Sequence, residues 1–378
     1  DTSSNACTIT LPASASVGDT IIFTDYARNW GTNGITIDSN GLNYQSKDDT
    51  FTVEYGTDGM TVAITYMNAT QGWVPTIDEA VADVPSITQG IFGFGHDGSS
   101  DTAVTNLVSD VGVVATDVAG VGTARDELAA CEYGGDKGIF GFGGEYADET
   151  NLVSNTGVVG SDVTGVGTDR RLLAACGYGE DKGIFGFGYT GSNVSMTNLV
   201  SNSGVVASDV TGVGTARSEL AACEYGGDKG IFGYGNGYVS MTNLVSNAGV
   251  VGTDVTGVGT ARRTLGACEY GEDKGIFGFG YTGSNVSMTN LVSNAGVVAT
   301  DVTGVGTARR GITACGYGYD KGIFAYGYTT GYVSMSNLVS NAGVVASDVT
   351  GVGTARGWPA PTQYGGDKGI FGYGEGAS

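Results

Sequence analysis

The stretch Gly183-Ile184-Phe185-Gly186-Phe187-Gly188 keeps bulky apolar residues apart with glycines, and close copies of it occur seven times along the chain. The copies begin at Gly90, Gly138, Gly183, Gly230, Gly275, Gly322 (where Ala325 replaces one glycine) and Gly369. Consecutive copies are 45 to 48 residues apart. A regular period of this length is typical of one structural unit repeated many times, so the sequence predicts a repeat fold.

One period, residues 183–229, shows what the unit contains. Four short strands are expected, at 183–188, 196–202, 204–210 and 220–225, separated by turns rich in glycine and asparagine. A hairpin at 226–229 leads into the next copy. Four strands without a helical stretch are typical of one blade of a β-propeller, so the predicted fold class is all-β.

The repeat resembles a kelch motif. The resemblance lies in Thr-Ala-Arg at 215–217, Leu-Ala-Ala-Cys at 220–223, the glycine-rich hairpin and the aromatic strand. It departs from the motif because Gly-(Phe/Tyr)-Gly replaces the glycine pair and the outer-strand tryptophan is missing. The resemblance covers about residues 89–378 and implies a kelch-like β-propeller. Six blades are expected, with the C-terminal piece completing the first; the seven aromatic copies leave seven blades as the alternative.

Six arginines recur at equivalent positions, namely Arg125, Arg170, Arg217, Arg262, Arg309 and Arg356. Six copies of one residue favour an architectural role, so we expect these guanidinium groups to hydrogen-bond to turn carbonyls. A cysteine follows each of the first five arginines, and these repeat cysteines are expected to be small buried thiols: Cys131, Cys176, Cys223, Cys268 and Cys315.

Residues 1–75 carry no repeat and predict a small all-β module for attachment or oligomerisation. Its short apolar-polar runs are separated by turn residues. Residues 76–88 hold two of the five prolines and several acidic residues, and are expected to form a linker.

A second resemblance concerns the amino-acid sequences of the repeats and of the N-terminal module. The segments 150–159 and 209–217 resemble repeats of virion structural and tail-fibre-like proteins of tailed phages of aquatic bacteria (cyanophage-like). Residues 9–20 and 69–73 resemble a module of phage tail fibres. The resemblance implies location on the virion, with other virion proteins bound through the N-terminal module. It also implies a homo-oligomer, with a trimer as the state common among tail fibres.

The function that this implies is a virion fibre or adhesin that binds a host surface polysaccharide or outer-membrane protein. The first alternative is a purely structural capsid or tail decoration protein without a receptor role. The second is a cell-encoded surface propeller that binds or cleaves glycans. The net charge of −22 argues against nucleic acid as a partner.

Neither a catalytic constellation nor a cofactor site stands out. The chain has a single histidine, His96, and its carboxylates recur in equivalent copies rather than as one distinct pair. We therefore expect no enzyme activity, no cofactor and no metal.

Function is expected where the copies differ, because loops on a rigid scaffold usually carry binding. Two zones vary: the loop after each aromatic strand and the triplet after each repeat arginine. Alternating strand directions should bring both zones to one face. The alternative is that these loops vary because nothing constrains them. The candidate ligand-binding residues are Tyr146, Arg171, Tyr189, Asn193, Tyr238, Arg263, Tyr281, Asn285, Arg310, Tyr328, Tyr332 and Trp358.

Overall fold

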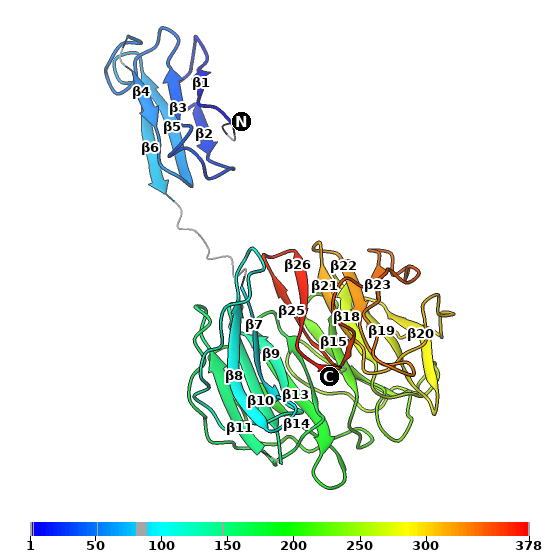
Figure 1. Cartoon of the computed structure of the whole chain (residues 1–378). Helices are drawn as coiled ribbons and strands as arrows, with labels where there is room; N and C mark the ends of the chain where they lie inside the picture. The colour runs from blue at the N-terminus through cyan, green and yellow to red at the C-terminus, as the bar shows by residue number, and fades with distance from the viewer. Residues whose placement is uncertain (1, 3, 51, 81–88, 146, 377–378) are drawn as a thin grey trace. The chain divides into compact units, whose positions relative to one another are not determined.

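The chain folds into two compact units, Asp1–Pro85 and Ser86–Ser378, each of which is described by itself. The computed structural model describes residues 2, 4–50, 52–80, 89–145 and 147–376. Within these ranges every regular element is a β-strand, which confirms the all-β prediction (Figure 1). No helix in the described part of the chain is long and apolar enough to cross a membrane.

The first unit is built from two three-stranded sheets. One sheet has the order β1-β3-β4 and the other the order β2-β5-β6. The strands are β1 (Cys7–Thr10), β2 (Thr20–Thr24), β3 (Ile35–Asp38), β4 (Val53–Tyr55), β5 (Met60–Asn68) and β6 (Gly72–Ala80). Their core contains Trp30, Ile64 and Trp73, all nearly inaccessible to solvent. Burial of such large apolar side chains is the main source of stability for a module of this size.

Strand β6 extends past the expected end of the first module. It continues to Ala80, inside the segment 76–88 that the sequence predicted as a linker. Pro75 argues against a strand, yet it is accommodated where the β5–β6 register shifts, between Ala63 and Ile64. The remainder of the predicted linker, 81–88, lies outside the described residues.

The second unit consists of short antiparallel sheets in sequence order. Five of them have three strands; the two-stranded sheet β7-β8 precedes them, and the two-stranded sheets β25-β26 and β24-β27 follow them. The first pair is β7 (Gly90–His96) with β8 (Asp101–Val108). In each three-stranded sheet the second strand along the chain is the central one. The first two of these sheets are β9 (Ala129–Tyr133), β10 (Lys137–Gly143) and β11 (Ala147–Val153), then β12 (Ala174–Tyr178), β13 (Lys182–Tyr189) and β14 (Asn193–Val200). The other three are β15 (Ala221–Tyr225), β16 (Lys229–Gly233) and β17 (Thr242–Val245), then β18 (Gly266–Tyr270), β19 (Lys274–Tyr281) and β20 (Asn285–Val292), and last β21 (Thr313–Tyr317), β22 (Lys321–Ala325) and β23 (Ser336–Val339). The last elements are β24 (Arg356–Gly357), β25 (Ala360–Tyr364), β26 (Lys368–Gly372) and β27 (Glu375–Gly376).

The strand predicted at 204–210 does not form. This segment makes only isolated bridges to β14, Val200 with Val206 and Thr197 with Val210. Between the two bridges the amide of Asn198 donates to the carbonyl of Ala207, at 3.0 Å. A side chain therefore replaces part of the backbone ladder, so the unit has three strands and a bridged segment.

Glycines in the aromatic strand make room for the neighbouring unit. A Cβ on Gly186 would lie 2.7 Å from the ring of Phe232, and one on Gly183 would lie 2.5 Å from the sulfur of Cys131. The rings of Phe187 and Phe232 pack with centroids 5.3 Å apart. The repeated pattern of small and large residues therefore encodes unit-to-unit packing.

The last aromatic copy packs against the first. Strand β25 pairs with β26, so the described pairings do not include the expected completion of the β7–β8 sheet by the C-terminal piece. Instead β25 lies beside β7 (Figure 1). The rings of Phe92 and Tyr373 meet edge-to-face with centroids 5.4 Å apart, and the equivalent ring pairs of the other neighbouring units have centroids 5.3 to 5.9 Å apart.

Candidate functional site

The repeat arginines hold the framework on which the variable residues stand. Arg170 is fully buried and donates to the carbonyls of Phe187 at 2.9 Å and Thr168 at 3.2 Å, and to Oδ1 of Asn198 at 2.5 Å. Its guanidinium lies 4.0 Å from the ring centroid of Phe142, in the preceding unit. The predicted architectural role is confirmed for this residue and for four equivalents with the same asparagine bond, namely Arg125, Arg217, Arg262 and Arg309.

Burial lowers the pKa of Arg170 to about 10, so its side chain still carries a positive charge at neutral pH. The charge also holds a strained backbone. Phe187, whose carbonyl accepts from Nε, has a φ of 62°, a left-handed conformation that is costly for a residue with a side chain. The arginine therefore fixes the backbone at the bulge within β13, between Gly186 and Gly188.

The two variable zones lie side by side. Arg171 forms a β-bridge with Tyr189, and the same bridge joins Arg263 to Tyr281 and Arg310 to Tyr328. Each bridge ties the triplet after a repeat arginine to the loop after an aromatic strand. This contact agrees with the expected placement of both zones on one face.

The side chains of these residues form a row of arginines and tyrosines. Arg263 lies 5.6 Å from the ring centroid of Tyr238 and 5.8 Å from that of Tyr281. Arg310 lies between Tyr281, at 4.7 Å, and Tyr328, at 5.0 Å. Such cation–π contacts hold the charged groups in place at partly exposed positions. We call this set the Arg-Tyr row; its members are Arg171, Tyr189, Tyr238, Arg263, Tyr281, Arg310 and Tyr328.

Two glutamates that the sequence did not single out as site residues belong to the row. Glu127 pairs with Arg171 at 2.9 Å, and Glu219 pairs with Arg263 at 2.8 Å. Each glutamate lies two residues after a repeat arginine, and its partner lies in the next unit. A pair that spans 44 residues has no local pattern, although the period of the repeat aligns the two positions.

The other candidate residues lie around the row. Asn285 anchors it, donating to the carbonyls of Tyr328 and Thr329. Asn193 accepts from Ser218 at 2.9 Å, so it ties the start of β14 to the triplet after Arg217. The remaining candidates are Tyr332, which packs on Tyr328 at 5.4 Å, Trp358, which is 42% exposed, and Tyr146, which lies outside the described residues.

Main-chain hydrogen bonds join the six triplets beneath these side chains. In five of the six triplets the second residue donates its N–H to the carbonyl of its counterpart in the preceding unit, at 2.7 to 3.2 Å. We call this chain of bonds the backbone belt; it runs through Glu127, Leu172, Glu219, Thr264, Gly311 and Trp358. All six residues have φ between 48° and 57°, so the loops share one geometry whatever side chain they carry.

A second acidic cluster, also absent from the sequence-based candidates, lies on the first strands of three units. Glu132, Glu224 and Glu269 occupy equivalent positions in strands that pack on their neighbours. Desolvation, together with the nearby carboxylate of Glu132, raises the pKa of Glu224 to about 7. Desolvation and the carboxylate of Glu224 raise the pKa of Glu269 to about 8. Glu224 and Glu269 therefore take up and lose protons near neutral pH, and the charge of each affects the other.

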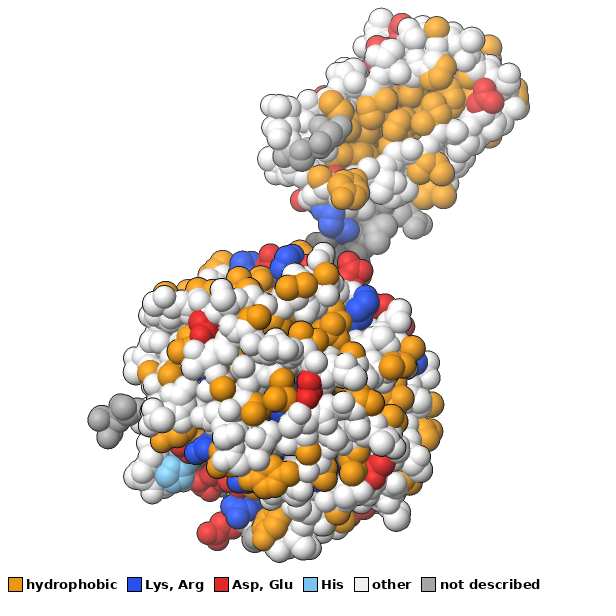
Figure 2. Space-filling view, turned by 90° about the vertical axis from the view of Figure 1, so that its right-hand side faces the viewer, with side chains coloured by type: hydrophobic (Ala, Val, Ile, Leu, Met, Phe, Trp, Pro, Cys, Tyr) orange, Lys and Arg blue, Asp and Glu red, His pale blue; other side chains and the backbone are white. Residues whose placement is uncertain are grey.

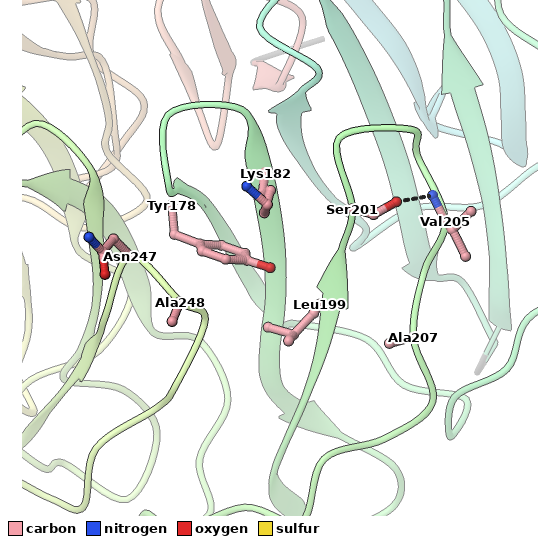
Figure 3. Close-up of a pocket in the computed structure, with 8 residues that line it drawn as sticks. All are labelled: Tyr178, Lys182, Leu199, Ser201, Val205, Ala207, Asn247 and Ala248. Atoms are coloured by element: carbon pink, nitrogen blue, oxygen red, sulfur yellow. Dashed lines mark hydrogen bonds between the residues drawn. The ribbon is translucent and has the colours of Figure 1, made fainter.

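A shallow hollow between two neighbouring repeats of the second unit is lined mainly by apolar side chains, unlike the Arg-Tyr row. It has a volume of about 370 Å³ and lies beside Tyr178, Leu199 and Ala248 (Figure 3). A Cβ on Gly249 would come within 3.0 Å of both Tyr178 and Leu199. An equivalent glycine lies against a tyrosine and a leucine at Gly204, Gly296 and Gly343, so the hollow belongs to the packing between neighbouring repeats.

No family model and no curated protein matches this chain. Its fold is similar to that of a solved fungal alcohol oxidase of the AA5 family in complex with copper. The TM-score is 0.54 at 14% identity, and the alignment covers 74% of this chain. It spans 66% of the oxidase chain, just under two thirds of its length.

This likeness contradicts the sequence-based prediction that the chain is not an enzyme. The two proteins share a fold, and that fold carries an oxidase, so the architecture gives no reason to exclude catalysis. The copper of the oxidase does not fit the residues present here. Among the described residues no group of three or more His, Cys, Asp or Glu side chains is arranged so that it could hold a metal ion. Nδ1 of His96, the chain's one histidine, accepts the N–H of Gly98.

Proposed function

We propose that the chain is a virion fibre or adhesin of a tailed phage, which binds a host surface polysaccharide or outer-membrane protein through the Arg-Tyr row. The observation that carries this proposal is the contrast between constant and variable residues. Buried arginines such as Arg170 repeat without change beneath the row, whereas the row itself differs from unit to unit. Tyrosine and arginine on a rigid scaffold are typical of recognition surfaces.

We further propose that the second unit is a kelch-like β-propeller. The contact of Phe92 with Tyr373 supports closure by the last copy against the first. A bond from the Tyr373 hydroxyl to Asn106 supports it as well, because Asn106 is equivalent to the asparagines that receive the repeat arginines. This packing favours the count of seven over six, with the first blade lacking an inner strand and the last lacking outer strands.

In this proposal the first unit attaches the protein to other virion proteins and makes it an oligomer, with a trimer as the expected state. Several copies on one particle would then bind many weak sites at once. Multivalent attachment raises avidity without any new contact.

Adsorption competition on host cells tests the proposal. The purified full chain is added to cells before the virus, beside a variant with Tyr238, Tyr281 and Tyr328 changed to alanine. A matched control carries Tyr319→Ala; Tyr319 is 80% exposed and lies in a hairpin away from the row. We expect the wild type and the control to block attachment and the triple variant to fail. If wild type does not block, the adhesin proposal is refuted.

One observation favours the runner-up, a structural capsid or tail decoration protein. Figure 2 shows hydrophobic side chains scattered over one face of the second compact unit, Ser86–Ser378. The repeats leave equivalent valines about 65% exposed: Val158, Val205, Val250, Val297 and Val344. Exposed apolar rows of this kind suit packing against neighbouring proteins in a particle. Failure of the competition assay together with incorporation into purified virions would support this function.

A further inference from the structure

Arg310 differs from the other two arginines of the Arg-Tyr row in having no carboxylate partner within the described part of the chain. Arg171 is paired with Glu127 and Arg263 with Glu219. Among the ion pairs of the described residues there is none for Arg310. The position that a glutamate would occupy, two residues after Arg262, holds Thr264.

The backbone at Thr264 is the same as at the two glutamates. Its φ is 49°, against 48° for Glu127 and 50° for Glu219. Its N–H donates to the carbonyl of Glu219 at 3.2 Å, as the backbone belt requires. A glutamate at 264 would therefore reach Arg310 as Glu219 reaches Arg263. The threonine hydroxyl donates to the carbonyl of Arg263 instead, at 2.8 Å.

The unpaired guanidinium is nevertheless held in place. It lies between the rings of Tyr281 and Tyr328, and Asn285 fixes the main chain of Tyr328 through its carbonyl. One residue further along, Gly311 leaves room for an indole, because a Cβ there would lie 2.6 Å from the ring of Trp358. Trp358 is 42% exposed, so a cation and an open aromatic surface stand next to each other.

We infer that Arg310 binds the carboxylate of an acidic sugar, so that the ligand class of the proposed adhesin is a polyuronate glycan. A carboxylate can accept two parallel N–H bonds from the guanidinium fork. The apolar face of a pyranose ring can lie on an aromatic side chain such as Trp358. The net charge of −22 opposes the approach of a polyanion over most of the surface, so binding must depend on the local positive charge of Arg310. The inference rests on the proposed function.

Binding of the full chain to polygalacturonate and to alginate, measured by isothermal titration, tests the inference. Thr264→Glu should supply the missing internal partner and weaken binding about ten- to hundred-fold, the loss typical of one charge-assisted bond. Thr264→Gln has the same size without the charge and should bind like wild type. Arg310→Gln should match Thr264→Glu, and carboxyl-reduced polygalacturonate should bind as weakly to the wild type. Melting curves of all variants establish that they are folded.

Each other outcome overturns the inference. If the wild-type protein binds the native and the carboxyl-reduced polymers with equal affinity, the site does not recognise the carboxylate. If Thr264→Glu binds like Thr264→Gln, Arg310 is not the contact. If wild type binds neither polyuronate, the ligand class is wrong. In all three cases the adhesin proposal still stands when the chain blocks virus adsorption, so the two failures are distinguishable.

Discussion

Replacing Arg170 with methionine tests whether the buried arginines stabilise the repeats. The change keeps much of the apolar stem but removes three hydrogen bonds, to the carbonyls of Phe187 and Thr168 and to Asn198. Buried acceptors without a donor cost about 1–3 kcal/mol each, and the contact with the Phe142 ring adds about 2 kcal/mol. Relief from burying a charge offsets several kcal/mol of this loss.

The net expectation is a loss of about 4 kcal/mol in the free energy of unfolding, close to the values seen when a buried charged network is broken. Arg356→Met is the matched control. Arg356 is only partly buried and bonds to the hydroxyl of Tyr326 at 3.0 Å and, more weakly, to the carbonyl of Phe371 at 3.4 Å. We expect it to lose about 1–2 kcal/mol.

Urea unfolding followed by tryptophan fluorescence and by circular dichroism measures both losses, and agreement between the two signals checks that unfolding is cooperative. The reasoning is refuted if Arg170→Met and Arg356→Met lose the same stability. It is also refuted if Arg170→Met loses less than about 1 kcal/mol, because the hydrogen bonds would then contribute no more than the packing that methionine retains.

Three further predictions follow from the packing and the titrating groups. Gly186→Ala should lower the free energy of unfolding by about 1–3 kcal/mol, because the new methyl group would meet an aromatic ring of the next repeat. Gly331→Ala should leave it unchanged, because no atom lies within 4 Å of the new methyl group. Thermal melts compare the two variants. The pKa values of Glu224 and Glu269 rise from the ordinary 4.5 to about 7 and 8, so the folded state holds extra protons and the unfolding free energy should fall as pH rises from about 4.5 to 8. Glu224→Gln with Glu269→Gln should flatten that slope in urea titrations at several pH values, and an unchanged slope would contradict the assignment. Four repeat cysteines are buried as expected, whereas Cys131 is only half-buried. Burial raises the pKa of the four buried thiols, so a thiol reagent at pH 8 should modify them slowly in the native protein and quickly in urea; fast native labelling of these four would contradict their burial.

The repeat made much of the framework predictable. The period located the aromatic strands, and the identity of Arg170 with its equivalents indicated a shared structural role before any contact was known. The segment 204–210 was predicted wrongly because its valines have strand character, while a side chain, Asn198, takes over part of its ladder. Strand propensity does not reveal that competition.

The candidate site was predictable only in part. Variation between copies pointed to Arg263, Arg310 and the tyrosines around them, since the period aligns positions that ought to match. The pairing of Glu219 with Arg263 was not visible, because it depends on which side chains of adjacent units lie close together. Glu224 was missed for a similar reason: its pKa is set by enclosure and by carboxylates from other units.

The backbone belt separates the shape of the face from its chemistry. Its bonds use only main-chain atoms, so a residue such as Thr264 can be exchanged while the loop keeps its course. Whole repeats of about 47 residues could therefore be exchanged by recombination. Each repeat would bring its own side chains, while the backbone conformation of the loops would stay the same. The chemistry of the face could then change by reassortment of existing repeats, and a laboratory library built at the six belt positions would sample the same diversity without a new scaffold.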